Sequence, residues 1–210
     1  MIQGSDEWRQ ARLGKVTASR VADVVAKIKS GGYSASRQNY AAQLVVERLT
    51  GEPMKSFQSA EMTYGLECEP EARAAYSFLF DVDVTEVGFV CHPTIPDAGA
   101  SPDGLIGLDG VLEIKCPNTW THFDMAMRYS VPSDYVKQAQ WQMACTGRKW
   151  CDFVSYDRRV PEHMRLFRQR LMRDPEMIRK LEVEVIAFLA EVDGMIAKLA
   201  KTFGQREAAE

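Results

Sequence analysis

Residues 101–117, with the sequence SPDGLIGLDGVLEIKCP, constrain the fold more than any other segment of the chain. Asp109-Gly110 separates two apolar runs, which predicts a β-hairpin with a two-residue turn. In the second strand apolar residues alternate with Glu113 and Lys115, so both charged side chains lie on one face of the strand. The middle of the chain is therefore predicted to form part of a β-sheet.

Helical patterns lie on both sides of this hairpin. Ser5 caps a first short helix that Gly14 ends, a second begins near Thr17 or Ser19, and Ser36 caps a third. The predicted fold class is α/β, a single domain over residues 1–210 with a mixed central β-sheet flanked by helices. Further helices are expected at 60–80, with a kink or restart at Pro70, at 119–129, at 133–146 and from Pro175 to about Lys201. Extended segments are expected at 82–89, 150–156 and 164–171.

Composition narrows the class of protein. The chain has 46% hydrophobic and 26% charged residues. It contains neither an apolar run of the ~20 residues that a membrane span requires nor the layout of a signal peptide at its start. Five irregularly spaced cysteines and three scattered histidines favour reduced thiols and give no support to a zinc site. We therefore expect a soluble protein of the cytoplasm.

The formal net charge is −3, but the charge is unevenly spread. Residues 9–37 hold seven lysines and arginines against Asp23 alone, a balance of +6 that leaves −9 for the rest of the chain. A basic segment of this kind either binds phosphate groups or forms a solvated helix face. The arginines between residues 158 and 173 present the same two alternatives.

Asp103, Glu113 and Lys115 form the pattern with the most specific chemistry. Mg²⁺ binds carboxylate oxygens and water, and it polarises a phosphate and lowers the pKa of a bound water. Asp103 and Glu113 supply carboxylates, with the backbone carbonyl of Ile114 beside them, and Lys115 positions water or offsets charge on the phosphate. The pattern predicts metal-dependent phosphodiester hydrolysis, although each part alone also suits a turn or a surface ion pair.

The predicted hairpin sets one condition on this site. With a two-residue turn at Asp109-Gly110, Glu113 pairs with Ile106, and Asp103 points to the opposite face. The site therefore requires an irregularity, either in the S-P-D-G segment or as a bulge at Gly107.

The sequence as a whole resembles the lambda-type phage exonucleases, the YqaJ-like viral recombinase group of the restriction-endonuclease-like, or PD-(D/E)XK, nucleases. The resemblance runs from about Trp8 to Asp157 and implies a restriction-endonuclease-like core. It rests on five blocks in the family's order: WRQARLGKVTAS (8–19), GLECEPEAR (65–73), SPDGL (101–105), LEIKCP (112–117) and YVKQAQ (135–140).

The resemblance implies a catalytic and metal-binding set. Asp103, Glu113 and Lys115 match the family's metal-binding and catalytic residues, and Gln138 matches an active-site glutamine. Glu69 matches a further acidic residue near the metal ions, and its choice over neighbouring acids rests on the resemblance alone. The alternative for Glu69 is a solvated acidic surface. The alternative for Gln138 is a merely exposed glutamine.

Three further residues match phosphate-binding positions of the family: Arg12, Ser19 and Ser101. A serine near a helix N-terminus with an arginine close by suits an anion such as a DNA 5′-phosphate. The alternative for Ser19 is a plain helix cap.

The implied activity is that of a Mg²⁺-dependent 5′→3′ exonuclease, with two ions and Mn²⁺ as a substitute, that digests one strand of linear double-stranded DNA. The implied partners are DNA with free ends, a single-strand annealing protein, and further copies of the chain in a ring-shaped homotrimer. The implied setting is the cytoplasm of a bacterial host, with a phage or prophage gene. A structure- or sequence-specific endonuclease and a non-catalytic DNA-binding assembly protein are the alternatives.

Overall fold

The computed structural model describes residues 2–54 and 59–207. Its main sheet has five strands in the order β2-β5-β6-β7-β8. β6 and β7 run parallel, and the other neighbouring pairs are antiparallel, so the sheet is mixed as predicted. The strands are Val84–Thr85 (β2), Gly104–Ile106 (β5), Gly110–Lys115 (β6), Trp150–Tyr156 (β7) and Leu166–Met172 (β8).

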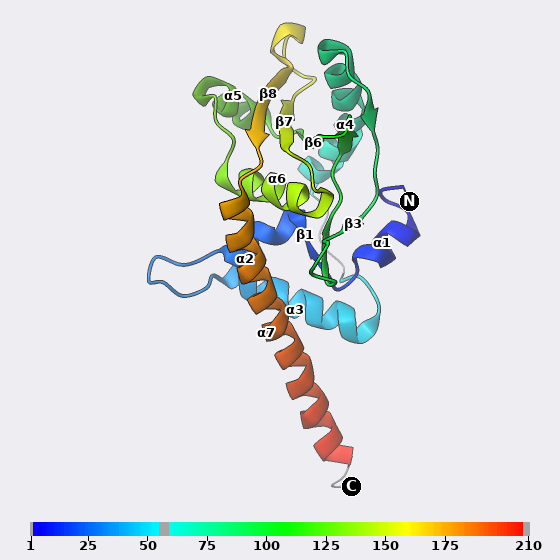
Figure 1. Cartoon of the computed structure of the whole chain (residues 1–210), viewed down its shortest axis with the longest axis vertical. Helices are drawn as coiled ribbons and strands as arrows, with labels where there is room; N and C mark the ends of the chain where they lie inside the picture. The colour runs from blue at the N-terminus through cyan, green and yellow to red at the C-terminus, as the bar shows by residue number, and fades with distance from the viewer. Residues whose placement is uncertain (1, 55–58, 208–210) are drawn as a thin grey trace.

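Helices cover both faces of this sheet (Figure 1). The alternation of β6 decides which side chains meet which helix. Leu112 and Ile114 pack with Tyr76 of α4 (Ala60–Phe80), whereas Val111 packs with Met143 of α6 (Ser133–Thr146). α5 (Thr119–Arg128) lies on the α6 side and contributes Met125 to the core. Because Glu113 and Lys115 share the parity of Val111, they lie on the face that α6 covers.

A second layer lies on the far side of α6. It contains a small sheet of order β1-β4-β3, made of Val16–Thr17, Ala98–Ala100 and Val90–Cys91. With α2 (Val21–Val25), α3 (Ala35–Thr50) and α7 (Pro175–Glu207) it forms the largest apolar core, which Trp141 of α6 enters. α6 is therefore a central helix, and its whole segment 138–145 is buried.

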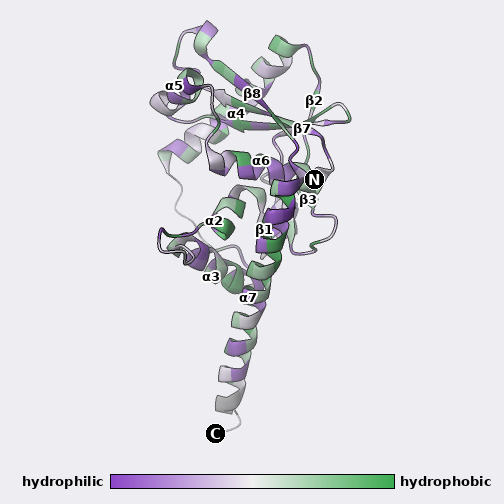
Figure 2. Ribbon diagram, turned by 60° about the vertical axis from the view of Figure 1, so that its left-hand side comes forward, coloured by the Kyte–Doolittle hydropathy of each residue, from purple (hydrophilic) through white to green (hydrophobic). Residues whose placement is uncertain are grey.

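The long helix α7 has two parts. In the first part, Leu181, Val185 and Phe188 are buried against α2 and α3. Beyond Ile196 the helix extends away from the rest of the chain, with Leu199 38% exposed (Figures 1 and 2). Among the described residues, no helix is both long and apolar enough to cross a membrane.

Helix boundaries at the N-terminal end follow the capping rules, with two corrections. The hydroxyl of Ser5 accepts a hydrogen bond from Trp8 N at the start of α1 (Asp6–Arg12), as predicted. The next helix is shorter than predicted, because Val16–Thr17 pairs as a strand with β4 and is followed by a 3-10 turn, η1 (Ala18–Arg20). Ser34 caps α3, so the prediction of Ser36 as the cap is wrong.

α4 continues through Pro70 without a restart, contrary to one of the two outcomes expected there. Proline leaves the carbonyl four residues earlier without its helical partner. That residue is Leu66, which is 63% exposed, so water can satisfy its carbonyl.

The hairpin of β5 and β6 differs from the prediction in its turn. Ile106 pairs with Gly110 and Gly104 with Leu112, so the turn contains three residues, 107–109, with Gly107 at a φ of 51°. The predicted two-residue turn is therefore wrong. The partner of each β5 residue lies three positions earlier in β6 than predicted. An odd displacement moves side chains to the other face. This change of register, and not a bulge at Gly107, supplies the irregularity that the site requires, and only Gly104 of the S-P-D-G segment lies in β5.

Candidate active site

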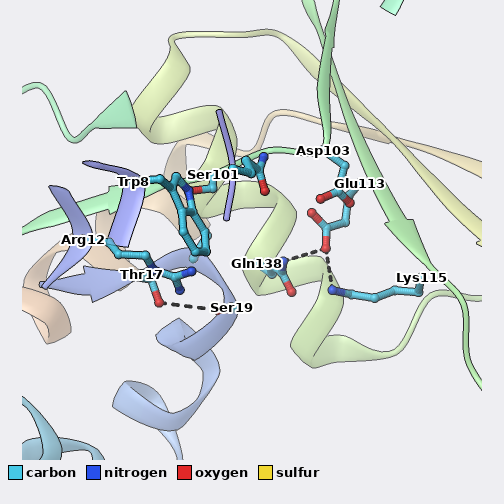
Figure 3. Close-up of a pocket in the computed structure, with 11 residues that line it drawn as sticks. Trp8, Arg12, Thr17, Ser19, Ser101, Asp103, Glu113, Lys115 and Gln138 are labelled. Carbon is cyan, nitrogen blue, oxygen red and sulfur yellow. Dashed lines mark hydrogen bonds and ion pairs between the residues drawn. The ribbon is translucent and has the colours of Figure 1, made fainter. Parts of the chain in front are cut away.

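One cavity of about 190 Å³ collects residues from both halves of the molecule. It lies where the carboxyl-terminal end of β6 meets α6, η1 and the N-terminal helix α1 (Figure 3). All of the predicted site residues except Glu69 and Ile114 line it: Arg12, Ser19, Ser101, Asp103, Glu113, Lys115 and Gln138, together with Gln3, Trp8, Thr17 and Ala18.

The displaced hairpin brings the two predicted carboxylates together. β5 begins at Gly104, opposite Leu112, so Asp103 lies just before the strand and near Glu113, and its amide donates to the carbonyl of Leu112 at 3.1 Å. The side chain of Asp103 accepts a 2.6 Å hydrogen bond from the amide of Ile114. The N–H and C=O of one strand residue point to the same edge. The carbonyl of Ile114 therefore faces the same edge as the Asp103 carboxylate. Its role as a metal ligand stays a prediction.

Glu113 is buried and tightly held. It is 1% exposed. Its Oε1 accepts from Nε2 of Gln138 at 2.6 Å and lies 2.6 Å from Nζ of Lys115 (Figure 3). Its Oε2 accepts from Nε2 of Gln142 at 2.5 Å. The alternative of an exposed Gln138 without a role in the site is therefore wrong.

Glu69 stands behind the cavity, on α4. Nη2 of Arg73, one helical turn later, lies 2.6 Å from its Oε1. The same guanidinium donates through Nε to the backbone carbonyl of Asp103 at 3.0 Å. Arg73 thus ties Glu69 to the segment that carries Asp103. Burial raises the pKa of Glu69, although Arg73 opposes the rise.

Burial and the neighbouring charges change the pKa values of Asp103 and Lys115. Burial, followed by the charges of Glu113 and Glu69, raises the pKa of Asp103 well above its ordinary range. Burial favours neutral Lys115, but the carboxylates of Glu113 and Asp103 outweigh it and raise the pKa of the lysine. Lys115 therefore stays charged. Any further positive charge nearby stabilises the charged forms of Asp103 and Glu113.

The opposite wall of the cavity offers groups that suit a phosphate. The guanidinium of Arg12 stacks on the ring of Trp8, 4.1 Å from its centroid. The indole N–H of Trp8 donates to the hydroxyl of Ser101 at 2.8 Å. Ser19 lies in η1, and neither helix that starts there is capped by a side chain. The capping role considered for Ser19 is therefore not supported, and its hydroxyl faces the cavity (Figure 3).

The basic segment 9–37 does not form one continuous phosphate-binding surface. Arg12 lines the cavity, whereas Arg20 pairs with Asp23 at 2.6 Å and Arg37 with Glu191 at 2.6 Å. The arginines of β8 are occupied in the same way, since Arg168 and Arg170 pair with Asp152. These arginines are occupied by ion pairs within the protein, and Arg12 is the arginine of segment 9–37 that lines the cavity.

The comparisons with known proteins agree with this geometry. The family model described as YqaJ-like viral recombinase domain matches residues 7–149. The chain belongs to this family. The predicted resemblance is confirmed, and with it the class of enzyme, a DNA nuclease with a restriction-endonuclease-like core. A search of curated proteins found no significant match.

Solved structures similar to this YqaJ-like chain include two of an alkaline exonuclease, LHK-Exo, from Laribacter hongkongensis. LHK-Exo is 52% identical, with 96% of this chain and 99% of that chain covered, at a TM-score of 0.89. Its complex with dAMP gives a TM-score of 0.90 at the same identity and coverage. A phage-related exonuclease from Haemophilus somnus 129PT is 17% identical, with 88% and 96% covered and a TM-score of 0.71, and shows the shared fold.

The prediction missed several residues that the structure brings to this YqaJ-like site. Trp8 lies one helical turn before Arg12, so the spacing of the first block contained a signal for it. Arg73 likewise follows Glu69 by four residues on α4. Gln142 follows Gln138 at the same interval, and their shared face was visible in the sequence. Its contact with Glu113 was not visible, because it depends on how α6 packs on the sheet.

Proposed function

We propose that this chain is a Mg²⁺-dependent 5′→3′ exonuclease that degrades one strand of linear double-stranded DNA and leaves 3′ single strands for recombination by strand annealing. The observation that carries the proposal is the shared cavity, with Asp103, Glu113 and Lys115 on one wall and the phosphate-binding candidates Arg12 and Ser19 on the other. One wall suits the scissile phosphate and the other a terminal 5′-phosphate. The relative LHK-Exo, solved with dAMP, supports release of mononucleotides.

The residues present fit Mg²⁺. Within the described part of the chain no group of three or more His, Cys, Asp or Glu side chains is gathered into a metal site. Mg²⁺, however, commonly uses one or two carboxylates and completes its shell with water and phosphate oxygens. Asp103 and Glu113 are such a pair, and burial, followed by the charges of Glu113 and Glu69, raises the pKa of Asp103, which favours a bound cation. Ile114 O and Glu69 are the further proposed ligands, and Mn²⁺ is the expected substitute.

The residues of the site have separate roles in the proposed reaction. One or two bound Mg²⁺ ions supply the polarisation of the phosphate and the acidity of the attacking water. Lys115, held by Glu113 at 2.6 Å, keeps its proton and offsets charge that develops on the phosphate. Gln138 holds Glu113 in place. Arg12, Ser19 and Ser101 bind the 5′-phosphate of the strand end.

The assembly and partners of the proposed enzyme follow from its family. In this proposal three copies form a ring around linear duplex DNA with a free end, and a single-strand annealing protein receives the 3′ strand. The setting is the cytoplasm of a bacterial host that carries the phage or prophage gene. Family resemblance is the support for these statements and for the 5′→3′ polarity.

The test compares linear and closed circular duplex DNA in Mg²⁺. The wild type degrades 5′-phosphorylated linear duplex and spares the closed circle. Lys115→Ala lowers the rate at least about 100- to 1,000-fold, the usual effect of removing one group that stabilises transition-state charge. Lys137→Ala is the matched control, since that lysine pairs with Asp134 on the outside of α6 and keeps the wild-type rate.

The other outcomes decide between the alternatives. Cutting of the closed circle identifies an endonuclease of the same fold. Intact linear duplex with pure protein and Mg²⁺ overturns the proposal and favours a non-catalytic DNA-binding assembly protein.

A further inference from the structure

Gln142 makes a contact that the proposed reaction does not by itself require. It lies on α6, one turn after Gln138, and is 0% exposed. Its Nε2 donates to Oε2 of Glu113 at 2.5 Å, while Oε1 of the same carboxylate receives Gln138 and Lys115. Each oxygen of Glu113 therefore has its own set of partners.

The two glutamines differ in their access to a ligand. Gln138 lines the cavity together with Glu113 and Lys115, whereas Gln142 is outside its lining. Any effect of Gln142 on chemistry in the cavity must therefore pass through Glu113. The oxygen that it holds, Oε2, is the one not shared with the cavity-lining partners.

The amide of Gln142 is only half satisfied. Among the described residues, its Oε1 is buried without a hydrogen-bond partner. A buried acceptor without a partner lowers stability, and an apolar side chain of similar length avoids that cost. A purely structural account therefore does not explain a glutamine here, whereas its donation to Glu113 does.

We propose that Gln142 is the positioning residue of Glu113. It holds Oε2 inside the protein, so that Oε1 is the carboxylate oxygen presented to a divalent cation, and it thereby sets the affinity of the site for Mg²⁺. The proposal rests on the proposed function, because it assumes that Glu113 binds the cation.

Gln140 provides the matched control. It is a glutamine of the same helix and is 3% exposed. Its Nε2 donates to the carbonyl of Met172, and its Oε1 accepts from the amide of Asp174. Both contacts are structural and avoid Glu113. Replacement by methionine keeps the length of either side chain and removes its hydrogen bonds.

The experiment titrates Mg²⁺ alone into the metal-free full-length chain by calorimetry, without DNA, and measures metal-free melting in parallel. Gln142→Met weakens Mg²⁺ binding by about 10- to 100-fold, as loss of an outer contact to a metal ligand commonly does, and lowers the melting temperature no more than Gln140→Met does. Gln140→Met lowers the melting temperature and leaves Mg²⁺ affinity at the wild-type value. Gln142→Asn, whose shorter amide loses reach to Glu113, repeats the loss of affinity if the methionine variant fails to fold.

The outcomes separate the two proposals. Wild-type Mg²⁺ affinity in a folded Gln142 variant overturns the positioning role alone. Equal losses of affinity in the Gln142 and Gln140 variants also overturn it, because they indicate a general structural effect. If the wild type shows no Mg²⁺ binding that the Glu113→Gln change abolishes, the metal-dependent function is overturned, and the positioning role with it.

Discussion

Two buried carboxylates on neighbouring strands have opposite surroundings. Glu113 of β6 pairs in register with Phe153 of β7, and Leu112 pairs with Asp152. Partners in register share a face, so Asp152 points to the α4 side of the sheet and Glu113 to the α6 side. Both are almost completely inaccessible to solvent, at 0% and 1% exposed. Their environments therefore differ in partners rather than in depth.

Asp152 is neutralised by the protein itself. Arg170 donates to both of its oxygens at 2.7 and 2.9 Å, Tyr76 donates at 2.6 Å, and Arg168 at 3.3 Å. Burial opposes its charge, but the hydrogen bonds and the arginines outweigh burial and lower the pKa of Asp152. This cluster is complete and needs no ligand.

The cluster around Glu113 is incomplete. Asp103 and Glu69 both have raised pKa values, because burial and neighbouring carboxylates act against Lys115 and Arg73. Raised values of this kind in a cavity are typical of functional sites. Burial alone therefore does not distinguish the cluster around Asp152 from the cluster around Glu113. The balance of charge around each carboxylate does.

Asp152→Asn has the largest expected effect on stability. The change leaves Arg168 and Arg170 without their counter-charge. We expect a loss of about 3 kcal/mol, the lower end for breaking a buried ion pair, because both arginines keep contact with water at 34% and 44% exposed. The melting temperature falls by about 6–12 °C for a domain of this size. Nuclease activity per folded molecule at 25 °C stays at the wild-type level, and its loss in the folded variant contradicts the distinction drawn between the clusters.

Gly107→Ala tests the turn that puts Asp103 on the face of Glu113. The φ of 51° is left-handed, and no atom lies within 4 Å of an added Cβ. The cost is therefore conformational, about 1–2 kcal/mol. Thermal melting is expected to show a decrease of about 2–8 °C with unchanged activity. A larger decrease, with loss of Mg²⁺ binding, indicates that the register itself has changed.

Asp103→Asn is expected to change stability in the opposite direction. The raised pKa of Asp103 means that the metal-free native state holds a proton more tightly than the unfolded state. Native stability therefore falls as pH rises from the ordinary value of 3.8 through the raised one. Asparagine removes this loss, so the variant melts higher than the wild type at pH 8 and at the same temperature at pH 4. Melting in EDTA at both pH values measures the difference, and a variant that melts lower at pH 8 contradicts the charge imbalance.

Local rules predicted much of the fold from single segments. The alternation in β6 separated Glu113 and Lys115 from the apolar face, and α6 begins and ends where predicted, at Ser133 and Thr146. These features depend on side-chain periodicity and capping, which act over a few residues. The catalytic candidates were visible for the same reason.

Partners at long range were not visible. The sequence left the basic segment as either a phosphate-binding surface or a solvated helix face, whereas the structure pairs Arg37 with Glu191, 154 residues away. Gln142 was a neighbour of Gln138 on one helix face, but its contact with Glu113 spans 29 residues. Such contacts depend on how helices pack on the sheet, which no local pattern encodes.

The sequence by itself identified the candidates for the chemistry: Asp103, Glu113 and Lys115 stand in a spacing that favours metal-dependent hydrolysis. Only the tertiary structure decided whether they meet. A three-residue turn at 107–109, in place of the predicted two-residue turn at 109–110, shifts the β5–β6 pairing by three positions and brings Asp103 beside Glu113. The physical reason is the two-residue period of a strand, in which any odd shift exchanges its faces. Pairing across the whole hairpin, rather than the turn dipeptide alone, sets that shift.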